Sequence, residues 1–307
     1  MIDILGKRYL FFAISALLIV PGLVILAIFG LPLSIDFEGG TMLDLSFASG
    51  NVPSTEEVHD IYLEHGLTDP QITSSSNGVL LIRSSFMDEG TRADLINEME
   101  ARFDDTVIVN RADSVGPTVG REVATRAAVA VGVAALAVII YITLAFRGVQ
   151  HSFRYGVCAI IAMIHDVLVV LSLAGIGGLL FSWQVDSLFL TALLSVIGFS
   201  VQDKVVVFDR IRENSAIYRK LPFEKLANHS IVQTLQRSIN TQLMTVEYML
   251  LALALFGGVT LRQFSITLLV GLFMGTYSSI FIAAPILVIW EKKEWRNWFG
   301  RKAETPA

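Results

Sequence analysis

The sequence predicts an α-helical membrane protein with six membrane-spanning helices and one inserted α+β domain. Hydrophobic residues make up 53% of the 307 residues and charged residues only 17%, whereas soluble domains carry about 25% charge. Six apolar stretches are long enough to cross a bilayer, which takes about 20 apolar residues. One long polar stretch, 34–122, interrupts them and has the length of a small domain.

The first predicted span, 9–30, follows Lys7 and Arg8. It is too long for a signal-peptide core and lacks a small-residue cleavage site, so we expect a retained anchor. The other spans are predicted at 125–146, 155–180, 187–208, 238–257 and 264–290. The predicted organisation is therefore 1–33 for the N-terminus and first helix, 34–122 for the inserted domain, 123–290 for helices two to six and 291–307 for a tail.

Basic residues predict the orientation of these spans. The short loops on one side carry Lys7, Arg8, Arg147, Arg154, Arg210, Arg212, Arg219, Lys220, Lys225, Lys292, Lys293, Arg296, Arg301 and Lys302. The opposite short loops hold only Arg262. Because Lys and Arg are enriched in cytoplasmic loops, both termini are predicted to be cytoplasmic and 34–122 to be extracytoplasmic.

The inserted domain reads as alternating strands and helices. Strand patterns occur at 39–47, 70–74, 78–85 and 105–112, and helix patterns at 53–66 and 87–103. Ser54 and Glu57 have the spacing of a capping box at the start of the first helix. The order βαββαβ predicts the split βαβ arrangement of a ferredoxin-like domain.

The segment "VGPTVG", residues 115–120, joins this domain to the second span. Gly116, Pro117 and Gly120 are turn-forming residues. They predict a fixed turn or hinge, and a plain linker is the alternative.

Several functional classes lack their sequence signals. The single Cys158 lies in an apolar stretch and the five His never reach ligand spacing, so we expect no disulfide and no metal site. No phosphate-binding loop or nucleophile elbow is present. With a net charge of −5, nucleic-acid binding is not expected. The protein is therefore predicted to be no enzyme and to use no cofactor.

Ionisable residues within or near the spans are the candidate functional residues. They are His165, Asp166, Asp203, Lys204, Arg237 and Glu247. With the histidine neutral, these groups sum to three negative and two positive charges, so one carboxylate lacks a partner. Such a group takes up a proton or binds a cation. The alternatives are a static ion pair between helices and, for Asp166, a helix–helix hydrogen bond.

The chain resembles SecF-type subunits of the SecD/SecF family of protein-export membrane proteins, in the RND superfamily. The resemblance rests on "IDFEGGT", "VGPTVGRE", "HDV", "IGFSVQDKVVVFDRIREN", "QTLQRSINT", "FGG" and "GLFMGTYSSIFIAAP". These motifs lie in the family's order across 35–290, nearly the whole chain. Each motif alone is weak, but the ordered set is specific.

This resemblance implies a function that composition does not show. It implies one half of an RND-type unit of twelve helices, completed by SecD beside the SecYEG translocon in the bacterial cytoplasmic membrane. Such a unit uses the proton gradient, or sodium in some relatives, to promote the export of unfolded polypeptides across a lipid membrane. An RND-type transporter half for lipids or small hydrophobic solutes and a non-coupled scaffold of the export complex remain as alternatives.

The resemblance also assigns roles to residues. Asp203 and Arg237 match the family's proton-coupling residues in spans four and five, and His165 and Asp166 match a further motif with a possible relay role. Ser200, one turn before Asp203, is a possible hydrogen-bond donor to it.

The chain departs from the family pattern at three positions. Gln202 stands where the family usually has Asn, Lys204 where it has Thr or Ser, and Glu247 where an acid is rare. Lys204 and Glu247 carry opposite charges and form a possible compensating ion pair. Alternatively, Lys204 extends to the cytoplasmic surface and Glu247 is protonated.

Small residues on the spans predict close helix packing. Gly271, Gly275, Ser278 and Ser279 give the sixth span a small-residue face, and alanines and Gly132 give the second span another. We expect the second span to pack within the chain and at least one face to contact SecD.

Overall fold

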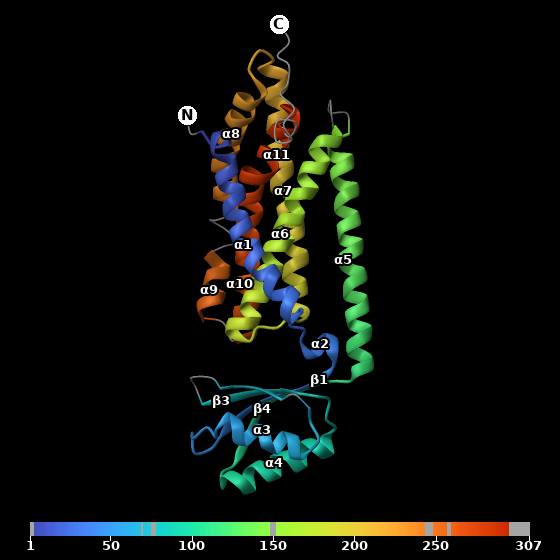
Figure 1. Cartoon of the computed structure of the whole chain (residues 1–307), viewed down its shortest axis with the longest axis vertical. Helices are drawn as coiled ribbons and strands as arrows, with labels where there is room; N and C mark the ends of the chain where they lie inside the picture. Colours follow the sequence, from blue (N-terminus) through green and yellow to red (C-terminus); the bar gives the residue numbers. More distant parts are fainter. Residues whose placement is uncertain are drawn as a thin grey trace. The chain divides into compact units, whose positions relative to one another are not determined.

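The computed structural model describes residues 3–68, 70–74, 78–147, 152–242, 248–256 and 259–294. The chain forms two compact units (Figure 1). The helical unit comprises 1–31, 131–183 and 188–307, and the sheet unit comprises 32–130 and 184–187.

Long apolar helices build the helical unit. Within the described residues, five helices are long and apolar enough to cross a membrane, which confirms five of the six predicted spans. They are α1 (Arg8–Phe29), preceded by the 3-10 turn η1 (Leu5–Lys7), then α5 (Pro117–Ala145), α6 (Ser152–Phe181), α7 (Ser187–Ile217) and a last helix made of α10 (Val259–Ser278), the π-helical segment η3 (Ser279–Ala283) and α11 (Ala284–Glu291).

The predicted span at 238–257 is not tested by these residues. Helix α8 (Phe223–Gln242) covers its beginning and α9 (Tyr248–Phe256) most of its second half. Residues 243–247 and 257 lie outside the described part of the chain.

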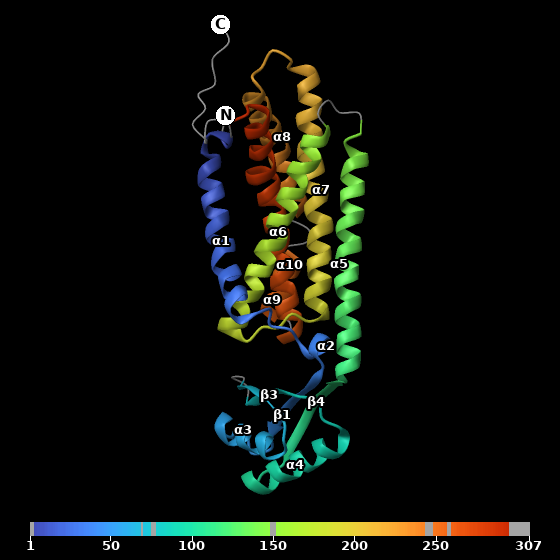
Figure 2. The same cartoon turned by 45° about the vertical axis from the view of Figure 1, so that its right-hand side comes forward.

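Helix α1 lies against α6 (Figure 2). The Ser172 hydroxyl of α6 donates a hydrogen bond of 2.7 Å to the Leu18 carbonyl of α1. Gly22 of α1 leaves no room for a Cβ beside Ser172. A small residue is therefore what lets the two helices approach closely.

The sheet unit contains one antiparallel sheet with the strand order β2-β3-β1-β4. Along the chain its elements are β1 (Gly40–Phe47), α3 (Thr55–Glu64), β2 (Gln71–Ser74), β3 (Val79–Ser84), α4 (Glu89–Phe103) and β4 (Val107–Val115). This is the predicted βαββαβ order. A short helix that the sequence pattern did not indicate, α2 (Ile35–Glu38), precedes β1.

Helices α3 and α4 cover the same face of the sheet (Figure 1). Alternate residues Leu43 and Leu45 of β1 are buried with Ile61 of α3 and Leu95 of α4 in one core. The period of two sends one face of each strand into that core. The capping box of α3 is present, since the Ser54 side chain accepts from the Glu57 amide and the Glu57 carboxylate accepts from the Ser54 amide.

The predicted turn or hinge at "VGPTVG" needs a correction. Strand β4 ends at Val115 and α5 begins at Pro117, so Gly116 alone connects them. Proline suits the first position of a helix because its missing N–H has no helical partner there. Gly120 lies inside α5, where an added Cβ would come within 2.6 Å of the Gly39 amide nitrogen. Its role is close packing against Gly39.

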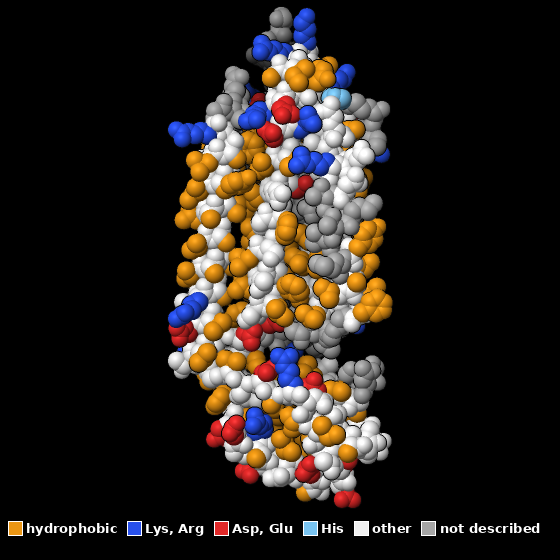
Figure 3. Space-filling model, turned by 180° about the vertical axis from the view of Figure 1, so that it is seen from behind, with side chains coloured by type: hydrophobic (Ala, Val, Ile, Leu, Met, Phe, Trp, Pro, Cys, Tyr) orange, Lys and Arg blue, Asp and Glu red, His pale blue; other side chains and the backbone are white. Residues whose placement is uncertain are grey.

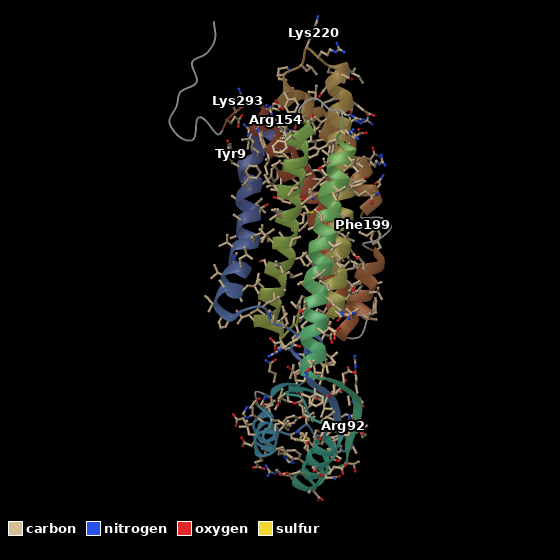
Figure 4. The ribbon with its side chains drawn as sticks, turned by 90° about the vertical axis from the view of Figure 1, so that its right-hand side faces the viewer. Tyr9, Arg92, Arg154, Phe199, Lys220 and Lys293 are labelled. Atoms are coloured by element: carbon tan, nitrogen blue, oxygen red, sulfur yellow. The ribbon has the colours of Figure 1, made fainter. Side chains whose placement is uncertain are left out.

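Charged side chains gather at one end of the helical unit. Figure 4 shows Tyr9, Arg154, Lys220 and Lys293 near that end. The outward faces of the long helices carry mainly apolar side chains (Figure 3). This distribution is typical of helices whose sides face lipid and whose ends face water.

Candidate functional site: a buried charge cluster between helices

Asp166 of α6 is the centre of a buried polar cluster in the helical unit. Its carboxylate is 1% exposed. The Oδ2 atom accepts hydrogen bonds from Lys204 Nζ at 2.7 Å, Ser200 Oγ at 2.5 Å and Ser278 Oγ at 2.8 Å. The Oδ1 atom lies 3.0 Å from His165 Nδ1. Four polar partners from three helices therefore surround this carboxylate, and charge-assisted hydrogen bonds of this kind are strong.

Lys204 of α7 is the cation of this cluster. Its side chain is 0% exposed, and its ammonium also donates to the Ser200 carbonyl at 3.3 Å and to Ser200 Oγ. Lys204 therefore does not extend to the surface, which rules out that alternative. The predicted span ended near residue 208, but α7 continues to Ile217, so Lys204 lies well inside the helix.

Asp203, the neighbour of Lys204, occupies a different environment. It is 7% exposed, and its Oδ1 and Oδ2 accept hydrogen bonds from Ser238 Oγ at 2.9 Å and Ser279 Oγ at 2.8 Å. No cation within the described residues forms an ion pair with it. Ser200 donates to Asp166 rather than to Asp203, contrary to expectation.

Arg237 is not brought to Asp203 in this structure. Its side chain is exposed on α8, whereas the next residue, Ser238, is 2% exposed and bonds Asp203. Successive residues of a helix project about 100° apart. Sequence reasoning had no signal to favour Ser238 over Arg237 on this helix.

The predicted pairing of Lys204 with Glu247 concerns a residue outside the described part of the chain. The structure does give Lys204 another partner, Asp166, at 2.7 Å. Both groups of that pair are buried, and removal of one partner of a buried pair typically costs roughly 3–5 kcal/mol.

His165 adds a titratable ring beside the cluster. Its Nδ1 contacts Asp166, and its Nε2 is buried without a hydrogen-bond partner among the described residues. The ring stacks on Tyr277, with centroids 6.3 Å apart. The tautomer in which Nδ1 carries the proton satisfies Asp166 and leaves Nε2 as an acceptor.

The small residues of the last span hold the cluster together. An added Cβ at Gly271 would collide with Val196 of α7, and one at Gly275 would lie 3.2 Å from Ser200 Cα. Ser278 and Ser279 then reach Asp166 and Asp203 respectively. This face is thus used within the chain, whereas Gly132 of α5 has nothing within 4 Å. The expectation that the second span packs internally is wrong for the Gly132 face.

The site therefore places two buried carboxylates and one buried ammonium inside an apolar helix bundle. Within the described residues, no group of three or more His, Cys, Asp or Glu side chains is placed to hold a metal ion.

Comparisons with known proteins identify the relatives of this arrangement. The model of the C-terminal region of protein export membrane proteins SecD/SecF matches residues 95–293, and the SecD/SecF GG motif matches 24–50. The chain is 74% identical over 304 residues to protein translocase subunit SecF of Anaerolinea thermophila, covering 99% of both chains. It is 44% identical to the SecF subunit of Thermobaculum terrenum, covering 98% of both.

A solved structure of SecDF from Thermus thermophilus, titled a translocon-associated membrane protein, is also similar. It superposes with a TM-score of 0.81 at 32% identity, covering 95% of this chain and 39% of that one. This chain therefore spans about two fifths of the length of that SecDF protein. The chain belongs to the SecD/SecF family of protein-export membrane proteins, as a SecF-type transport subunit of the Sec protein translocase.

Proposed function

We propose that this subunit couples the proton gradient to polypeptide export, with Asp203 as the carboxyl that gains and loses the proton. The observation that carries the proposal is a buried carboxylate with two serine hydroxyls and no described cation beside it. A hydroxyl both donates and accepts, so Ser238 and Ser279 can satisfy Asp203 whether it is ionised or protonated. Asp166, whose ammonium partner fixes its charge, lacks that freedom.

His165, Asp166 and Arg237 have proposed supporting roles. His165 contacts Asp166 through Nδ1, and its buried Nε2 has no hydrogen-bond partner among the described residues. The ring is therefore suited to accept a proton at Nε2 and relay it toward the cluster through Nδ1. Arg237 adjoins Ser238, and a turn of α8 by about one residue would present its guanidinium to Asp203. Such an exchange of a proton for an arginine partner is the proposed coupling step.

SecD is the proposed membrane partner. The similar SecDF chain is more than twice as long as this one, so a second half is needed to complete the same unit. The SecYEG translocon, an exported unfolded polypeptide and surrounding lipid complete the proposed set of partners. The basic residues support cytoplasmic termini and an extracytoplasmic sheet unit in the bacterial cytoplasmic membrane.

The test is Asp203→Asn, assembled with SecD in inverted membrane vesicles with an imposed proton gradient. We expect the gradient-dependent part of translocation to be lost while gradient-independent translocation remains. Asp209→Asn is the matched control, because Asp209 lies on the same helix but is 45% exposed and pairs with Arg212. Equal stimulation in Asp203→Asn and wild type would refute coupling and leave the scaffold function.

A further inference from the structure

We propose that the Lys204 ammonium is the built-in cation of an oxygen cluster and excludes free Na⁺ from it. With this cluster closed to Na⁺, coupling would rest on Asp203 alone, whose few oxygen neighbours suit a proton rather than a metal ion. The statement about coupling rests on the proposed function, whereas the statement about Na⁺ binding does not.

The cluster consists of oxygen ligands that suit a small hard cation. Around Lys204 Nζ lie Asp166 Oδ2 at 2.7 Å, the Ser200 carbonyl at 3.3 Å and Ser200 Oγ. Carboxylate, carbonyl and hydroxyl oxygens are the groups that hard metal ions select. Here an ammonium occupies the position that such an ion would take.

Geometry fixes the ammonium in that position. Ser200 lies one helical turn before Lys204, so the lysine side chain folds back over its own helix. Ser278 of α10 holds the same carboxylate oxygen at 2.8 Å. Helices α6, α7 and α10 therefore all constrain the cation, and it cannot leave the site as a free ion does.

Charge balance excludes a second cation. Asp166 and Lys204 are 1% and 0% exposed and neutralise each other. An added Na⁺ would place an uncompensated charge in a low-dielectric interior, which is strongly unfavourable. Asp203 is the remaining carboxylate. Among the described residues only the hydroxyls of Ser238 and Ser279 are hydrogen-bonded to it, fewer oxygen ligands than a hard metal ion takes. A proton needs no cage of oxygen ligands and can bind there.

The first experiment uses the wild-type full chain in detergent. Its thermal unfolding midpoint is measured while NaCl replaces choline chloride at constant ionic strength. We expect no saturable shift with Na⁺. A saturable Na⁺-dependent rise that Asp166→Asn abolishes would overturn the proposal.

The second experiment removes the built-in cation. In Lys204→Ser, we expect Na⁺ but not choline to raise the unfolding midpoint by a few degrees, because a ligand that binds only the folded state stabilises it. Lys204→Met should show no such rise, because an apolar chain fills the space. Lys220→Ser is the matched control at an exposed lysine.

Each outcome decides the question. A folded Lys204→Ser protein without a Na⁺ response overturns the proposal. If that variant is recovered folded only when purified in NaCl, the proposal is supported, and if it is recovered in neither salt, the proposal fails. No gradient is applied in these measurements, so their failure is distinct from a failure of proton coupling at Asp203.

Discussion

Two aspartates in the same helix bundle differ in what holds them. Asp166 has an ammonium within 2.7 Å, and Asp203 has only hydroxyl groups within hydrogen-bonding distance among the described residues. Both are buried. The two carboxylates are therefore held by different groups, one by an ammonium and the other by serine hydroxyls.

A double-mutant cycle measures the strength of the fixed pair. Asp166→Asn and Lys204→Met should each lower the free energy of unfolding by roughly 3–5 kcal/mol, because each leaves an uncompensated buried charge. The double variant should recover a large part of that loss. Unfolding by denaturant in detergent gives the coupling energy.

The matched control for this cycle is the exposed pair Asp209 and Arg212. Their side chains are 45% and 46% exposed at a separation of 2.6 Å, and exposed pairs contribute about 0–1 kcal/mol. Strictly additive losses at Asp166 and Lys204 would contradict the pairing seen here.

A pH dependence is expected from Glu224 at the start of α8. The hydrogen bond from Lys292 lowers the pKa of Glu224 from its ordinary value of 4.5, burial opposes the change, and Arg8 adds to the lowering. A lowered carboxyl pKa stabilises the fold above the ordinary value, and the contribution is lost as pH falls through the still lower folded value.

Glu224→Gln should therefore lower the unfolding midpoint at pH 7, and the difference from wild type should shrink as the pH falls below about 4.5. Glu213→Gln is the control, because Glu213 is 49% exposed and, among the described residues, pairs with Arg210 alone. An equal deficit at pH 7 and at pH 3 would contradict the electrostatic origin.

At the scale of single helices, the space around a glycine Cα shows whether that face of the helix packs closely against a neighbour. Gly271→Ala places a Cβ against Val196, which is overpacking and should cost about 1–3 kcal/mol. Gly132→Ala meets nothing within 4 Å and should stabilise α5 by roughly 0.5–1 kcal/mol through helix propensity. Unfolding midpoints of the two variants in detergent should move in opposite directions, and a shared direction would refute this assignment of faces.

Sequence patterns predicted the elements better than their contacts. The length of each apolar run located five long helices, and the alternation in Leu43 and Leu45 located the buried face of β1. The ionisable residues of the cluster were also identified from their apolar surroundings. Their pairing was not, because which residues face each other depends on helix rotation. Nothing in the sequence indicated that Asp166 would lie 2.7 Å from Lys204, and the predicted partner Glu247 lies outside the described residues.

At the scale of the whole molecule, α5 is the least buried of the five long apolar helices that the structure describes. In its most apolar window only 6% of residues are buried. Val133, Leu136 and Ile140 are all more than half exposed. Because the similar SecDF chain contains a further half, we expect this apolar face to contact SecD.

Cysteines at Val133 or Leu136 in a Cys158→Ala background should cross-link to SecD in membranes through a bifunctional thiol reagent or engineered cysteine partners. A cysteine at Ile142, which is 0% exposed on the same helix, should not. Equal yields at Val133 and Ile142, or none at either exposed position, would exclude α5 as the contact helix.

The π-helical segment η3 lies between the cluster and the charged end of the last helix. The hydrogen bonds of a π-helix join residues i and i+5, one residue further apart than in an α-helix. Conversion of η3 to α-helix would therefore rotate α11 by about 100° and shift it by about 1.5 Å along the helix axis relative to α10. Ser279, at the start of η3, bonds Asp203, while Glu291, at the end of α11, pairs with Arg154 at 2.7 Å. Conversion of η3 to α-helix is therefore opposed while Ser279 keeps Asp203 and Glu291 keeps Arg154. Loss of the Ser279–Asp203 hydrogen bond would free η3 to convert, and the resulting rotation of α11 would strain the Glu291–Arg154 ion pair.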